Sequence, residues 1–137
     1  MTNLEMSEQF ADLVFLALDH GIDSVRSGGP LVPFIVVERG GERTLQRFVA
    51  ERLEQSEAQA RQALASLPSD VTASAFAYDA FITVEGTKTD AILVEASERG
   101  RPAGVRMAQR YTPKKFLRRF QTIGNPAFLG ECESQLK

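Results

Sequence analysis

The sequence predicts a single α+β domain with an antiparallel sheet of five strands and elements in the order α-ββ-α-βββ-α. Apolar residues recur at helical spacing in three stretches, and the alternation typical of strands fills much of the chain between them. Glycine-containing turns separate the last three expected strands, which favours a meander. With strands counted in chain order, the expected arrangement is 2-1-5-4-3, because it places the most apolar strand in the middle.

The first expected helix covers residues 4–19. Thr2 and Glu5 have the spacing of a capping box, and apolar residues follow at helical intervals. Gly21 suits the position after a helix end, where positive φ is common. His20 precedes it and suits the negative end of the helix dipole, so we expect a capping role for this histidine rather than a catalytic one.

Two strands joined by a hairpin turn are expected next. Residues 31–38 are almost continuously apolar, which indicates burial on both faces of the sheet. Gly40 and Gly41 tolerate the positive φ values of a two-residue turn, and residues 44–48 return as the second strand. A strand buried on both faces needs cover from each side. A second copy of the chain can supply it, which predicts a homodimer, or the helices of one chain can cover everything.

A second helix and three more strands make up the middle of the chain. Ser56 and Gln59 have capping-box spacing, and Pro68 stops the helix that follows them. The three expected strands then cover residues 73–84, 89–96 and 105–111. In the last of them, alternation places Val105, Met107 and Tyr111 on one face and Arg106 and Arg110 on the other.

A third helix is expected to begin at residues 112–113 and to stop at residues 124–126. Thr112 supplies a cap, and Pro113 takes the first helical position, where its missing N–H costs nothing. Phe116, Leu117 and Phe120 form an apolar stripe on this helix, and a Gly-Asn-Pro sequence ends it. The complete layout resembles the profilin, longin and roadblock group of folds, in topology alone, and such a likeness carries little functional weight.

Composition limits the class of protein. A chain of 137 residues suits one domain, expected over residues 1–137 with a loose acidic tail at about 131–137. Cys132 is the single cysteine, which excludes an internal disulfide and predicts a cytoplasmic location. The longest apolar run, residues 31–37, is too short to span a membrane, and no secretory leader is evident, so we expect no membrane partner.

Charge is distributed unevenly along the chain. Residues 1–98 carry a net charge of −9, whereas residues 99–130 carry +8 and no acid. Such asymmetry predicts an anionic partner, with phosphate bound at the start of the third helix and aromatic residues available to stack on nucleotides. The alternative is a solvated face above a buried apolar stripe, docked on the acidic remainder of the fold. The candidate anion-binding residues are Arg106, Arg110, Thr112, Lys114, Lys115, Arg118 and Arg119.

Three carboxylates form a weaker candidate site. If a loop spans residues 85–89, Asp79 lies opposite Glu95, and together with Asp90 they can hold a divalent metal as in a hydrolase. If the turn is only residues 86–87, the strand register shifts by one residue and this pair dissolves.

No motif determines a reaction. The sequence has no nucleophile elbow, no histidine and cysteine set at metal-binding spacing, and no dinucleotide-binding glycine pattern. We therefore expect a non-enzymatic binding or regulatory module that acts through protein contacts as a homodimer, without metal or cofactor. The first alternative is a binder of nucleic acid or another phosphate-bearing ligand through the basic segment 99–119. The second is a metal-dependent hydrolase that uses Asp79, Asp90 and Glu95.

Overall fold

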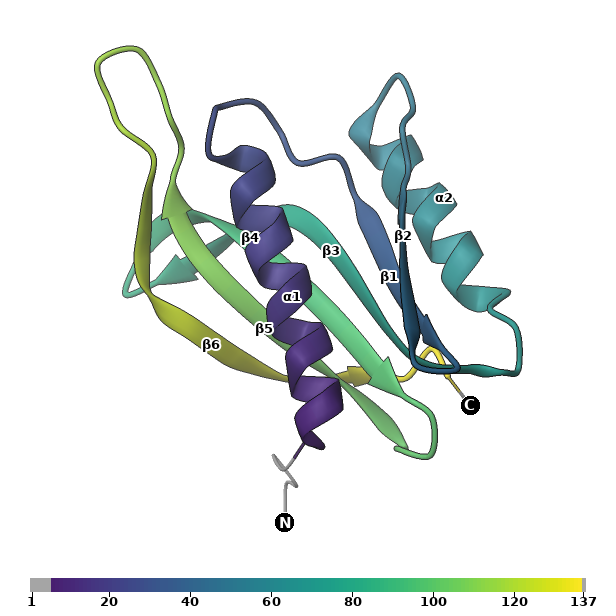
Figure 1. Cartoon of the computed structure of the whole chain (residues 1–137). Helices are drawn as coiled ribbons and strands as arrows, with labels where there is room; N and C mark the ends of the chain where they lie inside the picture. Colours follow the sequence, from purple (N-terminus) through teal and green to yellow (C-terminus); the bar gives the residue numbers. More distant parts are fainter. Residues whose placement is uncertain (1–5, 137) are drawn as a thin grey trace.

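The computed structural model describes residues 6–136, which form two helices and one six-stranded sheet (Figure 1). The strands lie in the order β2-β1-β3-β4-β5-β6, and all neighbours are antiparallel. In chain order the elements are α1 (Glu8–Val25), β1 (Phe34–Arg39), β2 (Glu42–Arg47), α2 (Leu53–Ala65), β3 (Val71–Val84), β4 (Thr87–Glu98), β5 (Ala103–Thr112) and β6 (Gln121–Glu133).

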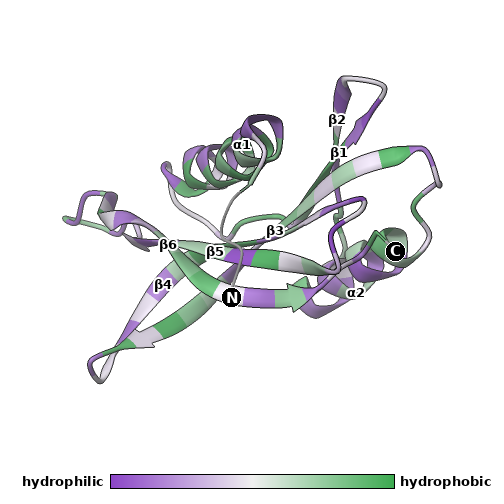
Figure 2. Ribbon diagram, turned by 90° about the horizontal axis from the view of Figure 1, so that it is seen from below, coloured by the Kyte–Doolittle hydropathy of each residue, from purple (hydrophilic) through white to green (hydrophobic). Residues whose placement is uncertain are grey.

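The two helices cover opposite faces of the sheet (Figure 2). Helix α1 packs against β3, β4 and β5, and its apolar side chains share one core with Phe34 and Val36 of β1. Helix α2 buries Ala60 and Leu64 in a second core with Ile35 of β1. Strand β1 is therefore buried on both faces, as its sequence predicts.

The helices of one chain supply the cover that β1 needs, so this argument for a homodimer no longer applies. The outer strand β6 is also poorly suited to pairing with a second copy, because Pro126 lacks a donor and the β5–β6 ladder contains two register shifts. The oligomeric state stays a prediction, which light scattering at high protein concentration tests.

The predicted strand order 2-1-5-4-3 is wrong, and with it the likeness to the profilin, longin and roadblock folds. Strand β3 pairs with β1, and β5 is separated from β1 by two strands. The 13-residue helix α2 is about 20 Å long, so it returns the chain to the nearby free edge of β1 more readily than to the far side of the sheet.

The predicted third helix is also wrong. Residues 113–120 form a hairpin loop, and residues 121–133 continue as β6 along the outer edge of β5. A helix shorter than about 12 residues is marginal without a well-packed face. By contrast, β6 pairs with β5 at both of its ends and in its middle, with two register shifts between, and satisfies backbone groups that would otherwise lie unpaired at the edge.

Helix α1 extends further than its sequence signals predict. The predicted capping residues Thr2 and Glu5 lie outside the described residues, and the observed N-cap is Ser7, whose Oγ accepts a hydrogen bond from the Phe10 amide. The helix continues past Gly21, where a Cβ atom would lie 2.7 Å from the Cγ2 atom of Ile92. Gly21 is thus a close-packing residue and not a helix end.

His20 does not cap the helix end. Its ring lies edge-on to Phe34, with ring centroids 4.9 Å apart, and Arg47 lies 2.8 Å from its Nε2 atom. Because arginine only donates, Nε2 is the acceptor and the ring is neutral. Burial, together with the charge of Arg47, lowers the pKa of His20.

Helix α2 begins three residues before the predicted cap Ser56. Its N-cap is Arg52, which makes no side-chain capping bond, and the buried Ser56 hydroxyl donates to the Arg52 carbonyl. At the C-terminal end, residues 131–136 are part of the fold, because Glu133 ends β6 and Leu136 is buried. Within residues 6–136, neither helix has the length and hydropathy needed to cross a bilayer.

Candidate functional site

The loop between β5 and β6 carries a compact group of cations and apolar residues, which we call the basic tip (residues 114–119). The Lys115 amide donates to the Arg118 carbonyl (3.1 Å) and the Arg118 amide donates to the Lys115 carbonyl (2.9 Å). These two bonds close a turn with Phe116 and Leu117 at its apex, where each side chain is 93% exposed. The predicted burial of this apolar stripe is therefore wrong for both residues.

The cations of the basic tip are available to a partner. Lys114, Lys115, Arg118 and Arg119 are all exposed, and none forms an ion pair with another described residue. The loop projects beyond the sheet at the upper left of Figure 1, and Figure 2 shows a hydrophobic apex between hydrophilic arms. The sequence contains this pattern, with two cations on each side of two apolar residues.

The base of the loop is anchored to the body of the protein. Phe120 stacks on Tyr111 with ring centroids 5.6 Å apart, and the Arg26 guanidinium lies 5.1 Å from the centre of the Phe120 ring. Tyr111 itself is buried in the core beneath α1. The apex is thus presented on a fixed base rather than on a free terminus.

Leu117 adopts an unfavourable backbone conformation for its residue type. Its φ angle is +66°, in the left-handed region where glycine or asparagine usually stands in a turn. A branched side chain at such a position costs about 1 kcal/mol. An exposed leucine therefore gives the turn no local stability, which points to a role in contacts outside the chain.

The other predicted anion-binding residues are only partly brought together. Thr112 ends β5 and pairs with Gln121, so no helix N-terminus is present there to hold a phosphate. Arg106 and Arg110 lie on the same face of β5, as predicted, but the Arg106 guanidinium pairs with Glu95 beneath α2. Only the basic tip retains four unpaired cations within six residues, among the residues the structure describes.

The three candidate carboxylates do not form one site. The turn between β3 and β4 is made by Glu85 and Gly86, so both predicted turns, residues 85–89 and residues 86–87, are wrong. The observed turn places Asp79 opposite Ile92. Asp79 and Asp90 lie on the α1 face of the sheet, whereas Glu95 lies on the α2 face. No group of three metal-binding side chains occurs within residues 6–136.

Glu95 instead organises a polar cluster beneath α2. Its carboxylate accepts a hydrogen bond from the Tyr78 hydroxyl (2.5 Å) and pairs with Arg61 (3.3 Å) and Arg106 (3.4 Å). The Arg61 guanidinium also lies over the rings of Phe76 and Tyr78. Burial opposes ionisation of Glu95, but the bonds from Tyr78 and Arg61 outweigh it and lower the pKa of Glu95. The cluster ties α2 to the sheet.

Asp79 has the opposite electrostatic environment. It accepts hydrogen bonds from the Tyr111 hydroxyl at 2.9 and 3.0 Å, yet burial and, to a lesser degree, the nearby charge of Asp90 raise its pKa. A carboxyl group with a higher pKa in the folded state than in the unfolded state resists ionisation in the folded protein. The free energy of unfolding therefore falls as the pH rises from the pKa of the unfolded state through the pKa of the folded state.

We expect the variant Asp79→Asn to gain stability relative to the wild type as the pH rises from about 4 to 7, because the buried charge is removed while an acceptor for Tyr111 remains. Urea unfolding of both proteins at several pH values measures this difference. A loss of stability in the variant that is the same at every pH would contradict the expectation.

Cys132 shows no sign of activation as a nucleophile. Its side chain lies on the α2 face, where burial and the charge of Glu95 raise the pKa of the thiol. His20 lies on the α1 face, beside Phe34. The sheet separates the single cysteine from the single histidine, so they cannot act as a pair.

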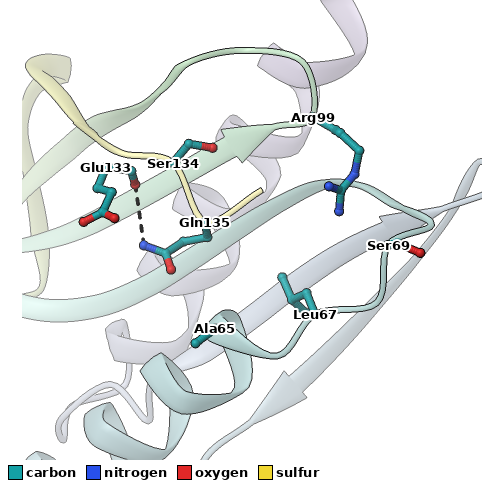
Figure 3. A pocket seen from close by; sticks show the side chains of 7 residues that line it. All are labelled: Ala65, Leu67, Ser69, Arg99, Glu133, Ser134 and Gln135. Atoms are coloured by element: carbon teal, nitrogen blue, oxygen red, sulfur yellow. Dashed lines mark hydrogen bonds between the residues drawn. The ribbon is translucent and has the colours of Figure 1, made fainter. Parts of the chain in front are cut away.

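A polar hollow of about 420 Å³ lies between the end of α2 and the C-terminal segment (Figure 3). The Arg99 guanidinium at its rim donates to the Val71 and Pro68 carbonyls, and the Gln135 side chain donates to the Glu133 carbonyl. Its polar groups therefore connect local segments of the fold. The lining residues are Ala65, Leu67, Ser69, Arg99, Glu133, Ser134 and Gln135.

No protein-family model, no curated protein and no solved structure matches the chain.

Proposed function

We propose that this chain is a non-enzymatic binding module that recognises an anionic partner through the basic tip. The observation that carries the proposal is the 93% exposure of Phe116 and Leu117 between four exposed cations. The apolar pair gains contacts only when something covers it. Because the residues around the pair are positively charged, a complementary partner carries negative charge.

The charge distribution favours one orientation of binding. Residues 1–98 carry a net charge of −9, so most of the molecule is repelled by an anionic surface. The basic tip is attracted to the same surface. The chain therefore acts as an electrostatic dipole that presents its apex first, which increases the rate of productive encounters.

The remaining polar groups support a binding role over catalysis. Glu95 is engaged by Tyr78 and two arginines, and its position on the opposite face of the sheet from Asp79 and Asp90 disfavours the metal-dependent hydrolase. The raised pKa of the Cys132 thiol likewise disfavours a covalent mechanism.

The test is a salt titration of binding to heparin, to oligothymidylate and to anionic lipid vesicles. Four cations that each displace a counterion predict a slope of about −3 in a plot of log K against log salt concentration. A variant with all four cations of the basic tip changed to glutamine is expected to lose nearly all of this dependence.

The matched control changes four exposed cations elsewhere to glutamine, and therefore has the same net charge as the tip variant. We expect the control to keep most of the wild-type affinity and slope. Equal losses in both variants, or no tip-dependent binding to any of the three probes, would overturn the proposed function. The control residues are Arg39, Arg47, Arg52 and Lys88.

A further inference from the structure

We infer that the anionic partner is a phospholipid membrane surface, into which Phe116 and Leu117 insert while the surrounding cations contact lipid headgroups. The inference rests on the proposed function and names the partner class of the same site. It concerns a peripheral contact and not a membrane span. From the sequence, no membrane partner is expected, because the apolar runs are too short to span a bilayer. This length requirement concerns spanning segments and does not apply to two apolar residues that insert from the surface.

The order of side chains along the hairpin matches the order of chemical layers in a bilayer. Phe116 and Leu117 stand at the apex. At the rise of an extended chain, Lys115 and Arg118 follow at about 3 Å and the next pair of cations at about 7 Å along the two arms of the loop. Apolar side chains of surface-bound proteins reach about 5–10 Å into the boundary between headgroups and acyl chains. The cations then lie at the depth of the phosphates, with their long stems against the apolar layer.

The backbone of the apex suits a region of low water content. Lys115 and Arg118 satisfy each other's amide and carbonyl groups through two hydrogen bonds. Pro113, at the entry to the loop, has no amide proton to desolvate. Both features lower the cost of moving polar backbone groups towards a hydrocarbon layer.

The identity of the second apex residue favours lipid over nucleic acid. A stacking platform for bases needs aromatic rings, and Phe116 provides one, but Leu117 has no π-face to offer a second base. Both apex side chains have the same use in a membrane, because each is buried among acyl chains. A leucine kept at φ +66° is consistent with selection for hydrophobicity rather than for turn formation.

A single tryptophan can report insertion directly, because the wild-type chain contains none. In the variant Phe116→Trp, we expect tryptophan emission to shift to the blue on addition of phosphatidylcholine vesicles with about 30% phosphatidylserine. Lipids brominated along the acyl chain are expected to quench this emission. Vesicles of phosphatidylcholine alone should cause little change in the emission, because their surface has no net charge to attract the cations.

The variant Phe116→Ser with Leu117→Gly separates binding from folding. Glycine relaxes the positive φ at position 117, so we expect thermal stability to be unchanged or slightly higher. Affinity for the anionic vesicles should fall at least about tenfold, because the inserted apolar area is lost. The matched control, Phe81→Ser with Val49→Ser, removes one exposed aromatic and one exposed aliphatic residue elsewhere and should keep wild-type affinity.

Each result of this experiment has a defined meaning. Blue-shifted, quenchable emission and a tip-specific loss of vesicle binding support the membrane contact. Tip-dependent binding to heparin or oligothymidylate without vesicle binding would overturn the membrane inference and leave the proposed function standing. Absence of tip-dependent binding to all probes would overturn both.

Discussion

The variant Glu95→Gln is expected to lose about 2–3 kcal/mol of unfolding free energy at pH 7. The Glu95 side chain is only 10% exposed, and glutamine would replace the charged acceptor of Tyr78 and the counter-charge of Arg61 and Arg106. The side chains of those arginines are 48% and 40% exposed, so water weakens their interaction with Glu95. The expected loss of unfolding free energy is therefore smaller than for a fully buried ion pair. Chemical denaturation measures the change.

The penalty for Glu95→Gln should depend on pH in a defined direction. The pKa of Glu95 is lowered from its ordinary value of 4.5, so its stabilising contribution is complete above that value and is lost as the pH falls through the folded pKa. The matched control Glu131→Gln, at an exposed position of β6, should change stability by less than about 0.5 kcal/mol. A penalty below about 1 kcal/mol for Glu95→Gln at pH 7 would show that the cluster is not stabilising.

The second large effect concerns the contact between α1 and β4. Ile92 is fully buried, and Ile92→Ala is expected to lower the unfolding free energy by about 2–5 kcal/mol by leaving a cavity. In the wild type, Gly21→Ala is expected to destabilise by about 1 kcal/mol, because overpacking against the Ile92 Cγ2 atom exceeds the gain in helix propensity.

The sign of the Gly21→Ala effect should reverse in the Ile92→Ala background. The clash is then absent, and the added methyl group improves helix propensity and fills part of the cavity. A double-mutant cycle measured by urea unfolding is expected to give a coupling of about 2 kcal/mol. Additive effects would mean that Gly21 is required for a reason other than close packing.

The candidate site shows where reasoning from local patterns fails. The Thr-Pro start and the helical spacing of Phe116, Leu117 and Phe120 favour a helix that begins at residue 113. Pairing of β6 with the long free edge of β5 overrides these signals, and only Phe120 then finds a packing partner, Tyr111. The charge asymmetry was visible in the sequence, but the loop conformation decides that the apolar pair is exposed with the cations.

The sequence by itself determined the features that depend on neighbours along the chain. Strand alternation placed Val105 and Met107 on one face of β5 and Arg106 on the other. The paired glycines placed the turn between β1 and β2. Both predictions succeed because side-chain direction along a strand and tolerance of positive φ are local properties. Only the tertiary structure decided the position of β3 beside β1, the gathering of three partners around Glu95 and the exposure of the basic tip. All three features depend on contacts between residues that are far apart in the sequence. The nearest free strand edge decides which strands pair, and the completed sheet decides which side chains stay exposed, so local sequence patterns do not predict them.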